Sequence, residues 1–197
     1  MKITKIQPAV KTAGRYNIFV DEKYSFSLDE NQLLDLKLKN GFEISEKQLD
    51  ELKGESEFGK AYARALELIL SRPRSEKEMA DYAWRKKWEE ELSDRVLGRL
   101  REKGYIDDLK FAQFWLRART GGKPSSKRKI SAELSQKGVK KETIDDVLKG
   151  YSDDQELEVL QALVSKKQSK YPDRQKFIAY LARQGYSFDS IKKVLDI

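Results

Sequence analysis

The sequence predicts a mainly helical protein with three tandem three-helix repeats in an elongated, curved array, preceded by a small α+β N-terminal extension with a β-hairpin. Three observations predict this fold class. The start of the chain is rich in β-branched and aromatic residues, the hydrophobic period becomes helical from about residue 57, and one pattern of caps and apolar positions occurs three times. Of the 197 residues, 39% are hydrophobic, so the chain can bury a core and we do not expect disorder.

The small extension is expected over residues 1–55. In "RYNIFVDEKYSFSL" the residues "VDEKY" supply a turn between two strands, and "ITKIQPAV" supplies a third strand before them. The stretches "DENQLLDL" and "SEKQLDEL" then predict two short helices. Ser45 is the expected N-cap of the second helix, and Gly54 is expected to end it. Residues 1–54 hold nine basic and nine acidic residues, so this part of the chain carries no net charge.

Three repeats are expected over residues 56–107, 108–152 and 153–197. The segments "SEKEMADYAWRKKW", "SKRKISAELSQKGV" and "DRQKFIAYLARQGY" align from their first residues, which are Ser75, Ser126 and Asp173. The alignment superposes apolar positions, namely Met79, Ile130 and Phe177, then Ala83, Leu134 and Leu181, then Trp88, Val139 and Tyr186, and finally Val96, Val147 and Val194. Each repeat is therefore expected to form helix, loop, cap, helix, short turn and helix, and to contact mainly its neighbours.

The sequence "SRPRSEKEM" predicts the start of the second helix of the first repeat. Pro73 disfavours a helical backbone at Arg72, the residue before it. Ser75 and Glu78 have the spacing of a capping box, in which the serine side chain and the glutamate side chain each bind the other residue's backbone N–H.

Aromatic residues in the repeats are expected to pack in the core. Phe111, Phe114, Trp115 and Ala118 are spaced to form one apolar stripe along a helix. We interpret Trp84 and Trp88 in the same way, because their spacing is also helical. A role as stacking platforms for nucleic-acid bases is the less favoured alternative.

The composition excludes several kinds of chemistry. The chain has no cysteine and no histidine, so disulfides, Ser-His and Cys-His nucleophiles and the usual zinc sites are excluded. We find no phosphate-binding loop or dinucleotide fingerprint, and we expect no enzymatic activity, catalytic residue, metal or cofactor. The aspartate pairs at 107–108 and 153–154 are expected to cap helices and interact with their dipoles, while Asp145 and Asp146 are expected to be solvated. The sequence also lacks an apolar run of membrane-spanning length, so we expect a cytoplasmic protein.

The positive charge is concentrated in one stretch. Residues 109–141 hold ten basic residues and one acidic residue, whereas the rest of the chain is nearly neutral. A concentrated basic field is typical of a polyanion partner, most often a nucleic acid, and a solvated surface is the alternative. Lys127, Arg128 and Lys129 are consecutive on a predicted helix, so they fan across it and at most two of them can face one partner. This pattern favours contacts with the phosphate backbone of a nucleic acid over recognition of its bases.

Several stretches resemble one known family. The segments "ALELILSRPRSEKEM", "LREKGYIDDLKFAQFWLRAR" and "SAELSQKGV", together with the three tandem repeats, are similar to RecX, the bacterial regulator of the RecA recombinase. The resemblance covers residues 60–197, and the strand-rich start is similar to an N-terminal extension of some members. In the first repeat "RKKWEEE" replaces the Lys-Gly turn usual in the family, so the helix there is expected to run on.

The resemblance implies a non-enzymatic, monomeric protein that lies in the groove of the RecA filament on single-stranded DNA. Family members typically limit filament extension, ATP hydrolysis, strand exchange and coprotease activity. We expect the partner face to hold six basic residues around the second repeat, with a smaller second patch in the first repeat. The six are Arg117, Arg119, Lys123, Lys127, Arg128 and Lys129, and the second patch is Arg72, Arg74 and Lys77.

Two other function classes stay open at this point. An autonomous DNA-binding protein, such as a transcription or nucleoid factor, would use the same basic repeat and would bind bare duplex with steep salt dependence. A protein–protein scaffold would have no affinity for nucleic acid. The sequence leaves open whether RecA is inhibited or stimulated, whether DNA is touched directly, the stoichiometry on the filament, and what the N-terminal extension does.

Overall fold

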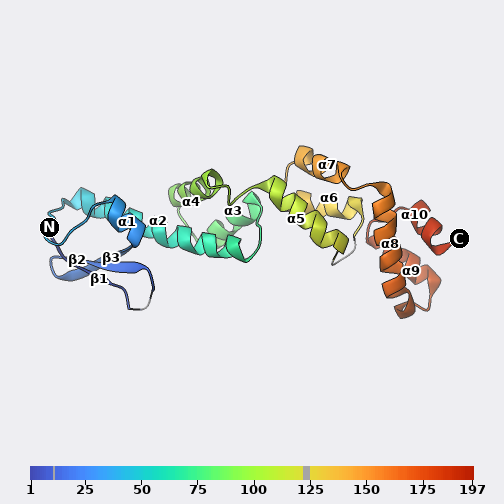
Figure 1. Ribbon diagram of the computed structural model, residues 1–197, viewed down its shortest axis with the longest axis horizontal. Helices are drawn as coiled ribbons and strands as arrows, with labels where there is room; N and C mark the ends of the chain where they lie inside the picture. The colour runs from blue at the N-terminus through green and yellow to red at the C-terminus, as the bar shows by residue number, and fades with distance from the viewer. Residues whose placement is uncertain (11, 122–124) are drawn as a thin grey trace. The chain divides into compact units, whose positions relative to one another are not determined.

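The computed structural model describes residues 1–10, 12–121 and 125–197. Within these residues the chain forms two compact units (Figure 1). The first comprises residues 1–71 and 87–102, and the second comprises residues 72–86 and 103–197. The first predicted repeat is therefore divided, because two of its helices lie in the first unit and one lies in the second. Each unit buries hydrophobic clusters of its own.

The first unit combines a small sheet with three helices. Its strands are β1 (Ile3–Pro8), β2 (Arg15–Val20) and β3 (Lys23–Asp29), and its helices are α1 (Glu30–Asp35), α2 (Glu46–Ser71) and α4 (Glu90–Glu102). The strands pair antiparallel in the order β1-β2-β3. Asp21 and Glu22 form the turn of the β2–β3 hairpin with positive φ angles, as a two-residue type I′ loop requires. The predicted hairpin with a third strand is confirmed.

Helix α2 corrects the prediction of a short helix that ends at Gly54. The helix begins as expected after Ser45, whose Oγ accepts a hydrogen bond from the backbone N–H of Gln48, while Gln48 Oε1 accepts one from the backbone N–H of Ser45. It then continues through Gly54 to Ser71. A glycine inside a helix costs only about 1 kcal/mol. Burial of four side chains along α2 outweighs that cost, namely Leu52, Ala61, Ala65 and Ile69.

The second unit is built of helices. They are α3 (Glu76–Arg85), α5 (Asp108–Gly121), α6 (Lys127–Gln136), α7 (Lys141–Lys149), α8 (Asp153–Lys167), α9 (Arg174–Arg183) and α10 (Phe188–Leu195), with a 3₁₀ turn at Gln168–Lys170. Side chains of Ser75, Ser126 and Asp173 cap the starts of α3, α6 and α9, the middle helices of the three repeats. The predicted mainly helical fold with three-helix repeats is confirmed.

The aligned apolar positions form the cores of the repeats. Ile130 and Leu134 are fully buried in the second repeat with Phe111 and Ile144. In the third repeat the same places are taken by Phe177 and Leu181, which are buried with Leu160 and Ile191 from the flanking helices. Met79 and Ala83 of α3 are also buried.

The turn after α3 corrects the expectation that this helix runs on. Helix α3 ends at Arg85, and Lys87 takes a left-handed backbone with φ of 55°. Gly138 and Gly185 occupy the equivalent positions of the other repeats with φ of 81° and 91°. The turn therefore forms without glycine, although a left-handed backbone costs a residue with a side chain roughly 1–2 kcal/mol.

Two of the expected core residues lie at the surface instead. Ala118 is exposed, and the buried face of α5 contains Ala112 beside Phe111. Trp84 is 81% exposed, because the buried side of α3 passes through Met79 and Ala83 and the next residue points about 100° away. The prediction of a core role is therefore wrong for Ala118 and for Trp84.

Candidate functional site

The basic segment divides into exposed and internally bonded side chains. Arg117 on α5 and Arg128 on α6 are exposed. Within the residues that the structure describes, neither side chain has a hydrogen-bond, ion-pair or ring partner. Lys123, which we also predicted in this site, lies outside the described residues. Arg117 and Arg128 are therefore the members of the predicted set whose charges are available to a partner.

Arg119 is held within the second repeat. Its Nε donates to Glu133 Oε2 at 2.6 Å, and its guanidinium lies 4.5 Å from the centre of the Trp115 ring. Trp115 Nε1 donates to the same carboxylate oxygen at 2.8 Å. Lys137 adds a second cation, with Nζ 4.6 Å from the Trp115 ring centre. This cluster joins α5 to α6, and Glu133 neutralises the charge of Arg119.

Lys127 and Lys129 bind the third repeat. Lys127 Nζ forms an ion pair with Asp153, the first residue of α8. Lys129 Nζ donates to Gln184 Oε1 at 2.6 Å, at the end of α9. Of the three consecutive basic residues, only Arg128 points away from these contacts, so the triplet serves mainly to join two repeats.

The second predicted patch is centred on the partly buried carboxylate of Glu78. Arg72 Nη1 and Nη2 donate to the two oxygens of Glu78 at 2.8 and 3.1 Å, and Lys137 Nζ binds the same group at 2.5 Å. Burial opposes ionisation of Glu78, but the hydrogen bonds from Arg72 and Lys137 outweigh it and lower the pKa of Glu78 to about 2. The capping box expected at Ser75 is therefore only half formed, because the Glu78 carboxylate is bound to these two cations.

The other two members of this patch differ from each other. Lys77 Nζ donates to the backbone oxygen of Gln136 at 2.9 Å. Arg74 Nε is buried, and no described residue provides a hydrogen-bond partner for it. Burial lowers the pKa of Arg74, and the neighbouring charges of Arg72 and Arg85 lower it further. Lys77 is thus bound within the second unit, whereas Arg74 is partly buried and forms no ion pair with a described residue.

The same serine contact joins successive repeats. Ser75 Oγ, which accepts from the backbone N–H of Glu78, donates to the backbone oxygen of Lys137 at 2.7 Å. Ser126 Oγ, which caps α6, donates to the backbone oxygen of Gln184 at 3.0 Å. In both places the start of one middle helix meets the end of the next. We call these contacts the serine junctions.

A carboxylate from the following repeat completes each junction. Asp108 Oδ1 accepts from the backbone N–H of Glu76 at 2.9 Å, and Glu156 Oε1 accepts from the backbone N–H of Lys127 at 2.7 Å. Asp107 caps its own helix through the backbone N–H of Lys110, as predicted, whereas Asp108 caps a helix of another repeat. Burial raises the pKa of Asp108, and the hydrogen bond from Glu76 opposes this effect.

Sequence reasoning missed the serine junctions, although a signal for them exists. Serine stands at the cap position of the first two repeats, and aspartate stands there in the third. The serines of the first two repeats donate to a carbonyl of the next repeat, and a serine hydroxyl can donate in this way while an ionised aspartate cannot. The serine at the cap position is therefore the signal in the sequence for this contact.

Among the described residues we find no cluster of three or more acidic side chains placed to hold a metal ion. No helix in the described part of the chain is long and apolar enough to cross a membrane.

The fold and the junctions define a protein of tandem three-helix repeats behind a small N-terminal domain. Models of the RecX family match the chain from end to end: the RecX N-terminal domain matches residues 1–45, and the first, second and third three-helix domains match residues 61–105, 107–148 and 153–195. A regulatory protein RecX of Listeria monocytogenes serotype 4a is 35% identical over 98% of this chain and 74% of its own length. The chain belongs to the RecX family.

Further similarities agree with this assignment. A regulatory protein RecX of Leuconostoc mesenteroides is 31% identical over 99% of this chain and 75% of its own length. A crystal structure of a regulatory protein RecX matches with a TM-score of 0.76 and 29% identity, covering 100% of this chain and 99% of that chain. RecX from Lactobacillus salivarius shares the fold, with a TM-score of 0.59 and 22% identity over 71% of this chain and 95% of that one.

Proposed function

We propose that this protein regulates the RecA recombinase as an inhibitor. It binds in the groove of the RecA filament on single-stranded DNA and limits filament extension, ATP hydrolysis, strand exchange and coprotease activity. It acts as a monomer and without chemistry of its own. The observation that carries the proposal is the succession of four RecX domains along the chain, since a relative that matches 98% of this chain bears the name of regulatory protein RecX.

The contact residues that we propose are fewer than the nine basic residues considered from the sequence. Arg117 and Arg128 are exposed and unpaired among the described residues, so they can bind a polyanionic partner without breaking an internal bond. Arg119, Lys127, Lys129, Arg72 and Lys77 already bind groups within the second unit. We assign these five to stability rather than to partner contact.

The test is single-stranded-DNA-dependent ATP hydrolysis by RecA, with this protein added at well below one copy per RecA protomer. A fall in the hydrolysis rate at such ratios is expected, because a few copies in the groove stop extension of a whole filament. An unchanged rate, combined with tight binding to bare duplex DNA, would replace the proposal with an autonomous DNA-binding role. An unchanged rate without affinity for DNA would favour a scaffold.

A further inference from the structure

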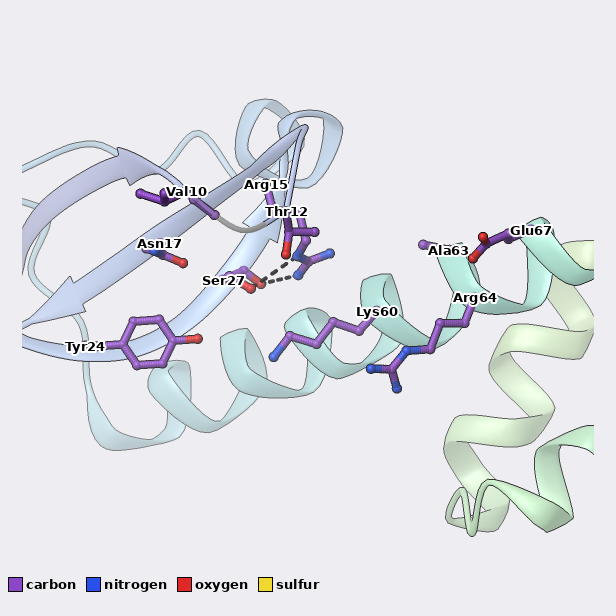
Figure 2. Close-up of a pocket in the computed structure, with 11 residues that line it drawn as sticks. Val10, Thr12, Arg15, Asn17, Tyr24, Ser27, Lys60, Ala63, Arg64 and Glu67 are labelled. Atoms are coloured by element: carbon purple, nitrogen blue, oxygen red, sulfur yellow. Dashed lines mark hydrogen bonds between the residues drawn. The ribbon is translucent and has the colours of Figure 1, made fainter.

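A cleft lies on the first unit. Its volume is about 670 Å³, which is in the range of sites for small ligands. Side chains of β2 and β3 line one wall, and α2 lines the other. Figure 2 shows Arg15 reaching the cleft from the sheet, and Lys60 and Arg64 reaching it from α2. The cleft is thus lined by two strands and a helix, and Ala9, Val10 and Thr12 belong to its described lining as well.

Three cations converge in this cleft with little compensation. Arg15, Lys60 and Arg64 line it, and Glu67 is the one acidic residue in the described lining. None of the three cations forms an ion pair with a described residue. Arg15 donates from Nε to Ser27 Oγ at 3.2 Å and from Nη2 to the backbone oxygen of Ser27, so its guanidinium is held in place by neutral groups.

The neighbouring cations disfavour the charge of Lys60. Burial lowers the pKa of Lys60, the positive charges of Arg15 and Arg64 lower it further, and Glu57 opposes the shift only in part. Burial also lowers the pKa of Arg15, against the effect of Asp29. Arg15 and Lys60 are partly buried and form no ion pair with a described residue, which is unfavourable for a cation, and a bound anion would relieve this cost. The chemistry of the cleft is therefore that of an anion site.

An exposed aromatic ring adjoins the cations. Tyr24 lines the cleft and is 56% exposed. Its ring packs edge to face on Phe19, with 6.0 Å between the ring centres, which leaves the Tyr24 ring supported and accessible. Lys5 Nζ lies 6.0 Å from the Phe19 ring centre, so this face of the sheet carries a further cation. Proteins that bind single strands combine such aromatic rings, on which bases stack, with cations along the backbone path.

We infer that this cleft binds single-stranded nucleic acid, with phosphodiester groups on Arg15, Lys60 and Arg64 and a base stacked on Tyr24. An acidic peptide would satisfy the three cations but would leave the supported tyrosine ring without a partner. A duplex keeps its bases stacked inside, so it cannot offer one to Tyr24. The inference is independent of the proposed regulation of RecA, and its test contains no RecA.

The test measures binding of the full chain to a labelled oligothymidylate of about 12 nucleotides by fluorescence anisotropy, over a series of salt concentrations. The double variant Lys60→Gln/Arg64→Gln is compared with Lys47→Gln/Lys53→Gln, which removes the same charge from exposed positions on the same helix. Each phosphate contact to a single strand contributes about 0.7 to the salt slope, so the cleft variant is expected to lower the slope by about 1.4. The control variant is expected to leave the slope unchanged.

Substitutions at Tyr24 separate stacking from charge. Tyr24→Leu is expected to weaken binding about 5- to 100-fold with an unchanged salt slope, because a base loses its stacking platform and no charge is altered. Tyr24→Phe keeps the ring and is expected to bind as the unmodified protein does. The unfolding midpoint of each variant is measured in parallel, and crosslinking to the unmodified protein keeps the inference testable if Tyr24→Leu fails to fold.

Photochemical crosslinking gives a reading that does not depend on stability. An oligonucleotide with iodo-deoxyuridine is expected to crosslink to the peptide that contains Tyr24. The inference is overturned if crosslinks occur only in peptides of the second unit, or if the cleft and control variants lower the salt slope equally. It is also overturned if the cleft variant loses affinity for a polyglutamate peptide but not for the oligonucleotide.

Discussion

The hydroxyl of Ser75 lies 2.7 Å from the backbone oxygen of Lys137 and donates a hydrogen bond to it across two repeats. The same hydroxyl oxygen accepts a hydrogen bond from the backbone N–H of Glu78. One fully buried group therefore both caps α3 and binds it to the end of α6. Ser126 likewise caps α6 and binds it to the end of α9. In tandem-repeat proteins such contacts between neighbours supply much of the stability, so the junction serines should be worth more than ordinary caps.

Ser126→Ala tests this relationship. The variant loses an N-cap, worth about 1 kcal/mol, and leaves the carbonyl of Gln184 without its donor, at a further cost of about 1 kcal/mol. We expect the free energy of unfolding to fall by about 2 kcal/mol, measured by urea denaturation.

Ser187→Ala is the matched control for Ser126→Ala. Ser187 is exposed and caps α10 through the backbone N–H of Ser190, without a bond to another repeat. We expect this variant to lose about 1 kcal/mol. Equal losses in the two variants would show that the junction bond adds nothing to the cap.

Gly185→Ala should disrupt the same junction from the other side. Gly185 has φ of 91°, and a Cβ added there would lie 2.3 Å from Ser126 Oγ. Gly104 has φ of 69° and open space at the position of a Cβ. We expect Gly104→Ala to cost about 1–2 kcal/mol from backbone strain alone. Gly185→Ala should cost about 1–3 kcal/mol more, because the clash adds overpacking, and calorimetric or urea unfolding of both variants checks the difference.

The Glu78 cluster predicts a defined pH dependence. The pKa of Glu78 is lowered from 4.5 to about 2 in the folded protein, so its contribution to stability is complete above the unfolded pKa and is lost as the pH falls toward 2. We expect Glu78→Gln to destabilise the protein by about 1–3 kcal/mol near neutral pH and by progressively less between pH 5 and 2. Urea unfolding of both proteins across this range gives the difference.

Glu91→Gln serves as the control for this pH series, because Glu91 is exposed in the first turn of α4. The free energy of unfolding of this variant should differ little from that of the unmodified protein at every pH. If the loss of unfolding free energy caused by Glu78→Gln stays constant from pH 7 to pH 3, the role assigned to the ionised carboxylate is contradicted.

Local chemistry explains what could be predicted from the sequence. Hydrophobic spacing identified the buried positions Ile130, Leu134, Phe177 and Leu181, and side-chain chemistry identified the serine and aspartate caps, because both signals lie within a few residues. The length of α2 could not be predicted from Gly54 alone. A glycine ends a helix only where burial of the flanking side chains does not outweigh the cost of a glycine in the helix, and that burial depends on tertiary packing.

The assignments of the basic residues could not be made from local signals. Lys127 and Lys129 bind residues that are 26 and 55 positions away in the chain, so their partners appear only once the repeats are packed. Arg128 lies between them and is a basic residue like them, so the sequence does not distinguish it, yet its side chain is exposed in the structure. The charge total of residues 109–141 therefore indicated a polyanion partner, but it could not separate the bonded cations from the free ones.

Arg117→Glu/Arg128→Glu tests the proposed contact residues. Both side chains are exposed and unpaired among the described residues, so the variant should keep its helical content and its unfolding midpoint. We expect the concentration needed for half-inhibition of RecA ATP hydrolysis to rise about tenfold or more, because two charges that attract the filament become repulsive. Lys166→Glu/Lys170→Glu reverses two exposed charges of the third repeat and is expected to change inhibition little. Unchanged inhibition by the Arg117/Arg128 variant, or an equal loss in both variants, would remove the basis for assigning these two residues to partner contact.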